Sequence, residues 1–187
     1  MKKLFIASIS IILLCSSSAN SERYTWDVNN NQYELISAGA PITWHAANNA
    51  AIALGGHLAT ILSAGEQDWI LSTFGTSKYI WIGGFQDPSH PEPPYDSGWQ
   101  WVTGETWDYT AWGPGEPNDF SGQNQDYLVL WQNHNGGWND AIYNDSRITY
   151  FLVEWDNIEI EDVIPEPMSI LLLAVSICIR LFISKKA

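Results

Sequence analysis

The most informative stretch of the chain is Trp112-Gly113-Pro114-Gly115-Glu116-Pro117-Asn118. A second motif, Gly137-Trp138-Asn139-Asp140, follows downstream. Together the two segments supply two carboxylates and two carboxamides. Their Gly- and Pro-rich context is typical of loops, and loops are where a scaffold usually presents binding groups. Hard oxygen ligands of this kind suit a calcium ion. We therefore expect these two segments to form a calcium-dependent binding site.

Helix signals occur only upstream of this stretch, whereas strand signals surround it. The first expected helix opens at Pro41 and Thr43 and ends at Gly55-Gly56, with an apolar face at Ala47, Ala50, Ala51 and Leu54. The second starts at the capping box Ser63-Ala-Gly-Glu66 and stops at Gly75. Strand-like segments cover residues 32–36, 57–61, 79–84, 98–102, 126–131 and 147–155. This order predicts an α+β domain whose residues 104–146 form a loop-rich region with one clear strand.

Charge and cysteine content narrow the possible functions. The 187 residues carry a net charge of −13, and residues 20–164 contain twenty acidic but only three basic residues. Such a surface repels phosphate backbones, so we expect no nucleic-acid partner. The two cysteines, Cys15 and Cys178, lie in apolar terminal segments, so the central region has neither a disulfide framework nor a thiolate metal site.

The two ends of the chain have the features of export signals. Residues 1–19 have a basic start, an apolar run and a small-residue cleavage site, as in a secretory signal peptide. An acidic linker, 157–164, follows the central region. Residues 165–187 then contain Pro165-Glu166-Pro167, a short apolar segment and a basic end, which indicates a membrane segment.

Two resemblances rest on these residues. Residues 32–156, after a lead-in at 20–31, resemble a cysteine-free C-type lectin-like domain of the kind common in bacterial secreted proteins. The matching pieces are Gly55-Gly56-His57-Leu58-Ala59, Trp81-Ile82-Gly83-Gly84, Glu116-Pro117-Asn118, Trp138-Asn139-Asp140 and Val153-Glu154-Trp155. The tail resembles the PEP-CTERM sorting signal. The resemblances imply two helices flanking small antiparallel sheets with a long ligand-binding loop, and export in a Gram-negative bacterium with processing by an exosortase. The protein would be tethered to the inner membrane before processing and would then reach the cell surface or extracellular matrix.

The lectin resemblance also implies a ligand set. Calcium would be bound by Glu116, Asn118, Gln125, Asn139 and Asp140, and the sugar by Glu116, Asn118 and Asn139, with Pro117 as a candidate for a cis peptide bond. Glu-Pro-Asn is similar to the mannose-type motif, which suits sugars with equatorial 3- and 4-hydroxyls, such as mannose, glucose or N-acetylglucosamine. Gln125 departs from the pattern, because the family normally has Glu there. The loss of one ligand charge predicts weaker calcium binding.

The alternatives concern the ligand and the class of activity. A module of the same fold could bind protein or matrix without calcium or sugar. A purely structural role in the matrix is a further alternative. Catalysis is not expected, because the central region has no Cys nucleophile, no Gly-x-Ser-x-Gly elbow, no His pair at metal spacing and no phosphate loop. The candidates for stacking on a sugar ring are Trp107, Trp112, Phe120 and Trp131, although core packing is the alternative for each.

Overall fold

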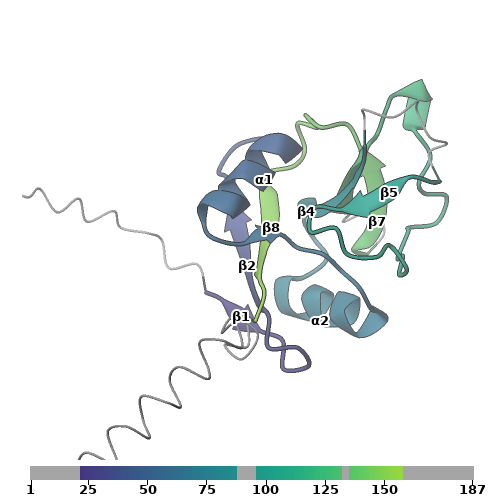
Figure 1. Cartoon of the computed structure of the whole chain (residues 1–187). Helices are drawn as coiled ribbons and strands as arrows, with labels where there is room; N and C mark the ends of the chain where they lie inside the picture. The colour runs from purple at the N-terminus through teal and green to yellow at the C-terminus, as the bar shows by residue number, and fades with distance from the viewer. Residues whose placement is uncertain (1–21, 88–95, 132–134, 158–187) are drawn as a thin grey trace, which may run out of the picture.

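The computed structural model describes residues 22–87, 96–131 and 135–157 (Figure 1). The expected signal peptide at 1–19 and sorting tail at 165–187 lie outside these residues. Among the residues described, no helix is both long enough and apolar enough to cross a membrane. The elements, in order, are β1 (Tyr24–Thr25), β2 (Gln32–Ser37), α1 (Trp44–Ala53), β3 (His57–Leu58), α2 (Ala64–Phe74), β4 (Ile80–Gln86), β5 (Trp99–Trp101), the 3-10 helix η1 (Phe120–Gly122), β6 (Tyr127–Trp131), β7 (Gly137–Ala141) and β8 (Tyr150–Trp155).

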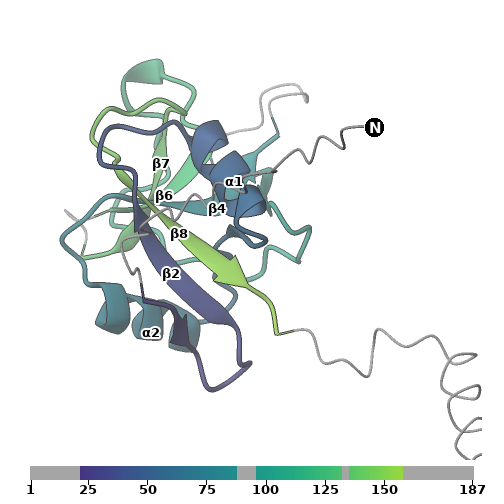
Figure 2. The same cartoon turned by 90° about the vertical axis from the view of Figure 1, so that its left-hand side faces the viewer.

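The strands form one connected sheet in the order β1-β2-β8-β4-β6-β7, with β3 paired to β8 and β5 paired to β4. The α+β class is therefore confirmed, but the expectation of purely antiparallel sheets is wrong in one place. β4 and β8 run parallel, pairing Ile80 with Tyr150 and Trp81 with Phe151. This short parallel contact joins the β1-β2-β8 part of the sheet to the β4-β6-β7 part. Figure 2 shows the long β2–β8 pair passing between α1 and α2.

Both helices begin where their capping residues predict. The Thr43 hydroxyl accepts a hydrogen bond from the Ala46 backbone N–H at 3.2 Å, and Ala47 and Ala51 of α1 are fully buried. Leu54, expected on the buried face, is 47% exposed, because the helix ends there. At α2, the Ser63 hydroxyl accepts from the Glu66 N–H at 3.2 Å.

The Glu66 side chain joins a buried hydrogen-bond network. Its carboxylate accepts from the Leu62 N–H at 2.8 Å and from the Tyr33 hydroxyl at 2.6 Å. The same hydroxyl lies 2.7 Å from Glu154 of β8. The network therefore links β2, the start of α2 and β8 in the interior.

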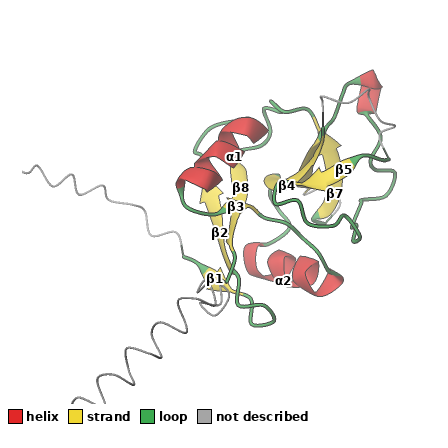
Figure 3. Ribbon diagram, viewed as in Figure 1, coloured by secondary structure: helices red, strands yellow, loops and turns green. Residues whose placement is uncertain are grey.

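A cluster of aromatic rings holds the loop-rich half of the molecule, which surrounds β5 and β7 in Figure 3. Trp138 of β7 is fully buried. The Trp101 and Trp112 rings meet it edge-on, with centroids 5.6 and 5.8 Å away, and Trp107 lies at 5.5 Å. Edge-to-face aromatic pairs contribute roughly 0.5–1.5 kcal/mol each beyond the area they bury. The residues between β5 and η1 are thus anchored to the core without regular secondary structure.

Asn139 and Asp140 lie on a strand, so the expectation that they lie on a loop is wrong. β7 pairs with β6, placing Asn139 opposite Val129 and Asp140 opposite Leu128. Asn135 and Gly136 precede β7 with φ of +52° and +82°. Asn-Gly in left-handed conformation is a common hairpin turn signal. The downstream half of the site is therefore built on a paired strand, which fixes its side chains more firmly than a loop would.

Candidate functional site

Backbone pairing brings together the two segments that organise the chain. Trp138 donates its N–H to the Ala111 carbonyl at 2.8 Å, and Gly113 donates to the Trp138 carbonyl at 2.8 Å. Trp112 and Trp138 therefore form a short parallel bridge. This bridge fixes the start of the Glu116-containing loop beside β7, two residues away from Asp140 along the strand.

The Asp140 carboxylate holds the other end of this loop. One of its oxygens, Oδ2, accepts from the backbone N–H groups of Asn118 at 2.9 Å and Asp119 at 2.7 Å. The peptide bond between Glu116 and Pro117 is cis. The loop from Glu116 to Asp119 thus wraps around a side chain of β7.

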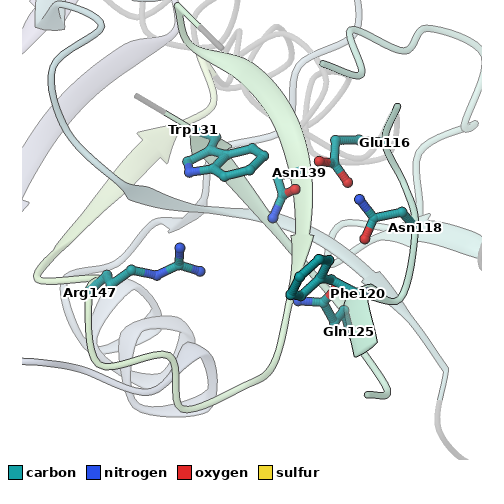
Figure 4. A pocket seen from close by; sticks show the side chains of 7 residues that line it. All are labelled: Glu116, Asn118, Phe120, Gln125, Trp131, Asn139 and Arg147. Atoms are coloured by element: carbon teal, nitrogen blue, oxygen red, sulfur yellow. The ribbon is translucent and has the colours of Figure 1, made fainter. Parts of the chain in front are cut away.

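A pocket of about 230 Å³ opens above this junction. Figure 4 shows Glu116 and Asn118 on one side, Asn139 between them and the far wall, and Arg147 reaching in from the far side. The complete lining is Glu116, Asn118, Phe120, Gln125, Trp131, Asn139 and Arg147. Four of the five expected calcium ligands line the pocket. The fifth, Asp140, is fully buried next to them.

Two carboxylate oxygens at this junction, Glu116 Oε2 and Asp140 Oδ1, are buried without a donor from any other residue, and the two carboxyl groups interact with each other. Burial and the negative charge of Asp140 raise the pKa of Glu116 from 4.5 to about 7. Burial also raises the pKa of Asp140, although the N–H groups of Asp119 and Asn118 oppose the shift. Buried carboxylate oxygens normally have a donor or a cation as partner. These residues therefore fit a bound cation.

Two of the three carboxamides of the site, those of Gln125 and Asn139, are buried. Gln125 is 8% exposed. Its backbone N–H donates to Asp119 Oδ1 at 3.0 Å, and its side-chain oxygen accepts from the Phe120 backbone N–H at 2.5 Å. Asn139 is 6% exposed and donates from Nδ2 to the Asp140 carbonyl. Its Oδ1 is the atom of this side chain that can bind a cation.

The aromatic candidates divide into two groups. Phe120 and Trp131 line the pocket, and Phe120 is 70% exposed. Trp107 and Trp112 pack against the core instead. Arg147 is a pocket residue that the sequence did not predict.

A second group of possible metal ligands lies around the C-terminal end of β8 and consists of His57, Glu154 and Asp156. The Glu154 carboxylate already accepts hydrogen bonds from Tyr33, Asn31 and Thr60 at 2.7–2.9 Å. His57 Nδ1 lies 2.9 Å from the Leu58 carbonyl, and Nε2 lies 3.4 Å from Asp156. These contacts indicate a structural role for His57.

Comparison with known proteins identifies the family. The family model "Lectin C-type domain" matches residues 40–150. The chain belongs to the C-type lectin domain family. This lectin domain is 32% identical over 108 residues to human versican core protein, a match that covers 58% of the chain but 3% of versican. Members of the family are binding modules, so the lectin domain is a binding module and not an enzyme.

Two solved structures resemble the lectin domain. One is the cow CD23 carbohydrate-recognition domain, solved in the presence of a GlcNAc2Man3 oligosaccharide; it is 27% identical, with a TM-score of 0.57 over 69% of this chain and 90% of that chain. The other is a calcium-independent type II antifreeze protein, which is 25% identical, with a TM-score of 0.54 over 67% and 88%. Proteins of this fold therefore include one solved in the presence of an oligosaccharide and one that is calcium-independent.

Proposed function

We propose that this lectin domain binds carbohydrate through a calcium ion held by Glu116, Asn118, Gln125, Asn139 and Asp140. The observation that supports the proposal best is the pair of buried, unpartnered oxygens on Glu116 and Asp140 beside the pocket. A divalent cation would neutralise both carboxylates and satisfy both oxygens. The neighbouring carboxamides of Asn118, Gln125 and Asn139 are neutral oxygen ligands that calcium accepts.

The bound ion would supply open coordination positions, because calcium takes roughly 6–8 oxygen ligands. Two adjacent sugar hydroxyls could occupy such positions. In this proposal, Glu116 accepts a hydrogen bond from one hydroxyl, and the Nδ2 groups of Asn118 and Asn139 donate to the hydroxyl oxygens. The Glu-Pro-Asn order favours mannose-like sugars with equatorial 3- and 4-hydroxyls. Phe120 and Trp131 offer apolar faces at the pocket wall.

The second candidate function is calcium-independent binding of a protein or matrix component. Gln125 favours it, because an amide replaces the expected carboxylate and its oxygen already accepts the Phe120 N–H. The similarity to a calcium-independent antifreeze protein is also consistent with it.

A glycan array separates the two candidates. The full chain should bind mannose-like glycans in calcium and release them in chelator, and Asp140→Asn should abolish that signal. Asp108→Asn, a change at an exposed loop carboxylate, is the matched control and should retain binding. Binding that is unaffected by the chelator, or confined to protein ligands, would favour the second candidate.

We further propose that the protein is exported by residues 1–19 and reaches the cell surface or matrix of a Gram-negative bacterium after an exosortase processes its tail. The support is the basic-apolar-small pattern at the start and the Pro-Glu-Pro, apolar and basic order at the end. Mass spectrometry of the protein recovered from the cell surface tests this proposal. An intact C-terminus on the surface-displayed protein would contradict it.

A further inference from the structure

We propose that the sugar bound in this pocket carries a carboxylate, as a hexuronic acid does, and that Arg147 binds that carboxylate. This inference rests on the proposed sugar-binding function and specifies its ligand class. Arg147 lines the same pocket as Glu116, Asn118 and Asn139, on the opposite wall. A ring whose hydroxyls lie near the first three side chains would therefore direct a substituent towards the guanidinium.

Neighbouring side chains hold the Arg147 guanidinium in position. Its Nε donates to the two Asp145 oxygens at 2.9 and 3.1 Å, and its Nη2 donates to Asp145 Oδ2. The Tyr79 ring lies 5.2 Å from its central carbon. An arginine restrained in this way loses little side-chain entropy when it binds a ligand. The side chain is nevertheless half exposed, as a ligand-binding group must be.

Donors remain available after these contacts. A guanidinium has five N–H donors in a planar fork, and Asp145 engages its Nε–Nη2 edge. Even if the Tyr79 hydroxyl accepts one more hydrogen bond, at least one N–H group remains for a ligand. Charge-assisted hydrogen bonds from Arg to carboxylate are roughly twice as strong as neutral ones. Arg147 therefore favours an ionised carboxylate over the hydroxymethyl group that a neutral hexose has at the same place.

The rest of the domain is acidic, so only groups inside the pocket can attract an anionic sugar. Residues 20–164 contain twenty acidic residues and only three basic ones, so the overall field repels anions. The other two basic residues have different environments. Arg23 pairs with Glu34 at 3.2 Å, and Lys78 donates to the Phe74 carbonyl at the end of α2. Of these three basic residues only Arg147 lines the pocket, so a preference of the site for an anionic sugar must come from Arg147.

The test compares two ligands with the same ring hydroxyls, methyl mannoside and methyl mannuronate glycoside, by calorimetry with the full chain in calcium. We expect the uronate to bind about tenfold more tightly, equivalent to about 1.4 kcal/mol. Arg147→Gln should reduce this ratio to near one. Arg23→Gln is the matched control, because it removes an ion-paired arginine of similar exposure elsewhere, and it should leave the ratio at about tenfold.

A second comparison uses only the wild-type protein, so it does not depend on whether a variant folds. Conversion of the uronate to its neutral methyl ester should cost the wild-type protein the same tenfold preference. Equal affinities for uronate, ester and mannoside would overturn the inference while leaving the proposed function intact. Failure of all three ligands to bind in calcium would overturn the proposed function and this inference with it.

Discussion

Replacement of Glu116 by Gln should make the calcium-free protein more stable at pH 8. In the wild type, Glu116 and Asp140 bring two carboxylates together at a junction where one oxygen of each is buried without a partner. Without a cation, their ionised forms repel each other and have lost part of their hydration. The Glu116→Gln substitution would remove one charge with little change in shape. At pH 8 the variant should therefore lack an unfavourable interaction that the wild type could lose only by protonation or by binding a cation.

The pKa of Glu116 sets the size of this effect. It rises from 4.5 to about 7 on folding. Each pKa unit corresponds to about 1.36 kcal/mol, so the full cost of ionisation at pH 8 would be roughly 3 kcal/mol. Solvent screening reduces it, because Glu116 is only partly buried, and we expect about 1–2 kcal/mol. The folded state holds the proton more tightly than the unfolded state between pH 4.5 and 7, so stability falls as pH rises through this range.

Urea unfolding of both proteins in chelator, at pH 8 and pH 5, measures the difference. The variant should be more stable at pH 8, and the gap should shrink towards pH 5, where Glu116 is protonated. Saturating calcium should then stabilise the wild type but not the variant, by about 2.7 kcal/mol at a hundredfold excess over Kd. Asp108→Asn controls for net charge. A variant less stable than the wild type at pH 8 in chelator would show that ionised Glu116 does not destabilise the calcium-free protein.

Two further predictions concern the scaffold. Tyr33→Phe removes a hydroxyl that lies within hydrogen-bond distance of both the Glu66 and the Glu154 carboxylates, and it should cost about 2–3 kcal/mol at pH 8. Burial raises the pKa of Glu66 to about 7, so Glu66 is protonated at pH 5 and the substitution should cost less stability there. A cost in urea unfolding that is equal at pH 8 and pH 5 would contradict the network. Gly56→Ala would place a Cβ 2.4 Å from the Glu154 carbonyl, so a backbone shift should cost more than about 2 kcal/mol. Gly104→Ala is the comparison, because Gly104 has φ +78° and open space around it; it should cost only about 1–2 kcal/mol. If Gly56→Ala and Gly104→Ala lowered the melting temperature equally, the predicted clash at Gly56 would be contradicted.

Local signals in the sequence predicted the elements that local interactions stabilise. Thr43 and Ser63 both accept the capping hydrogen bonds expected of them. The pairing of β4 with β8 was not predictable in the same way, because it joins residues about seventy positions apart through a two-residue parallel register. A short contact of this kind leaves no periodic pattern in either segment.

The candidate site was likewise predictable where short motifs mark it and not where long-range packing builds it. The motif order placed Glu116 and Asn118 near Asn139 and Asp140, and the structure brings them together. Strand β7 was mistaken for a loop, because Gly137 and two polar residues hide its pairing with β6. Arg147 could not be assigned to the pocket, because its position depends on its pairing with Asp145 and on the tertiary packing of the segment between β7 and β8. The motifs therefore predicted which residues come together, and tertiary structure added Arg147 on the opposite wall of the pocket.

A calcium titration of the full chain, followed by tryptophan fluorescence, is the direct test of calcium binding beside Glu116 and Asp140. The ring cluster around Trp138, next to Asn139, should report occupancy of the site. We expect saturable binding of one calcium ion that Asp140→Asn abolishes. Gln125→Glu should tighten binding, because it adds a charged ligand to Glu116 and Asp140. Absence of saturable binding, or an affinity unchanged in both variants, would contradict the proposed calcium site.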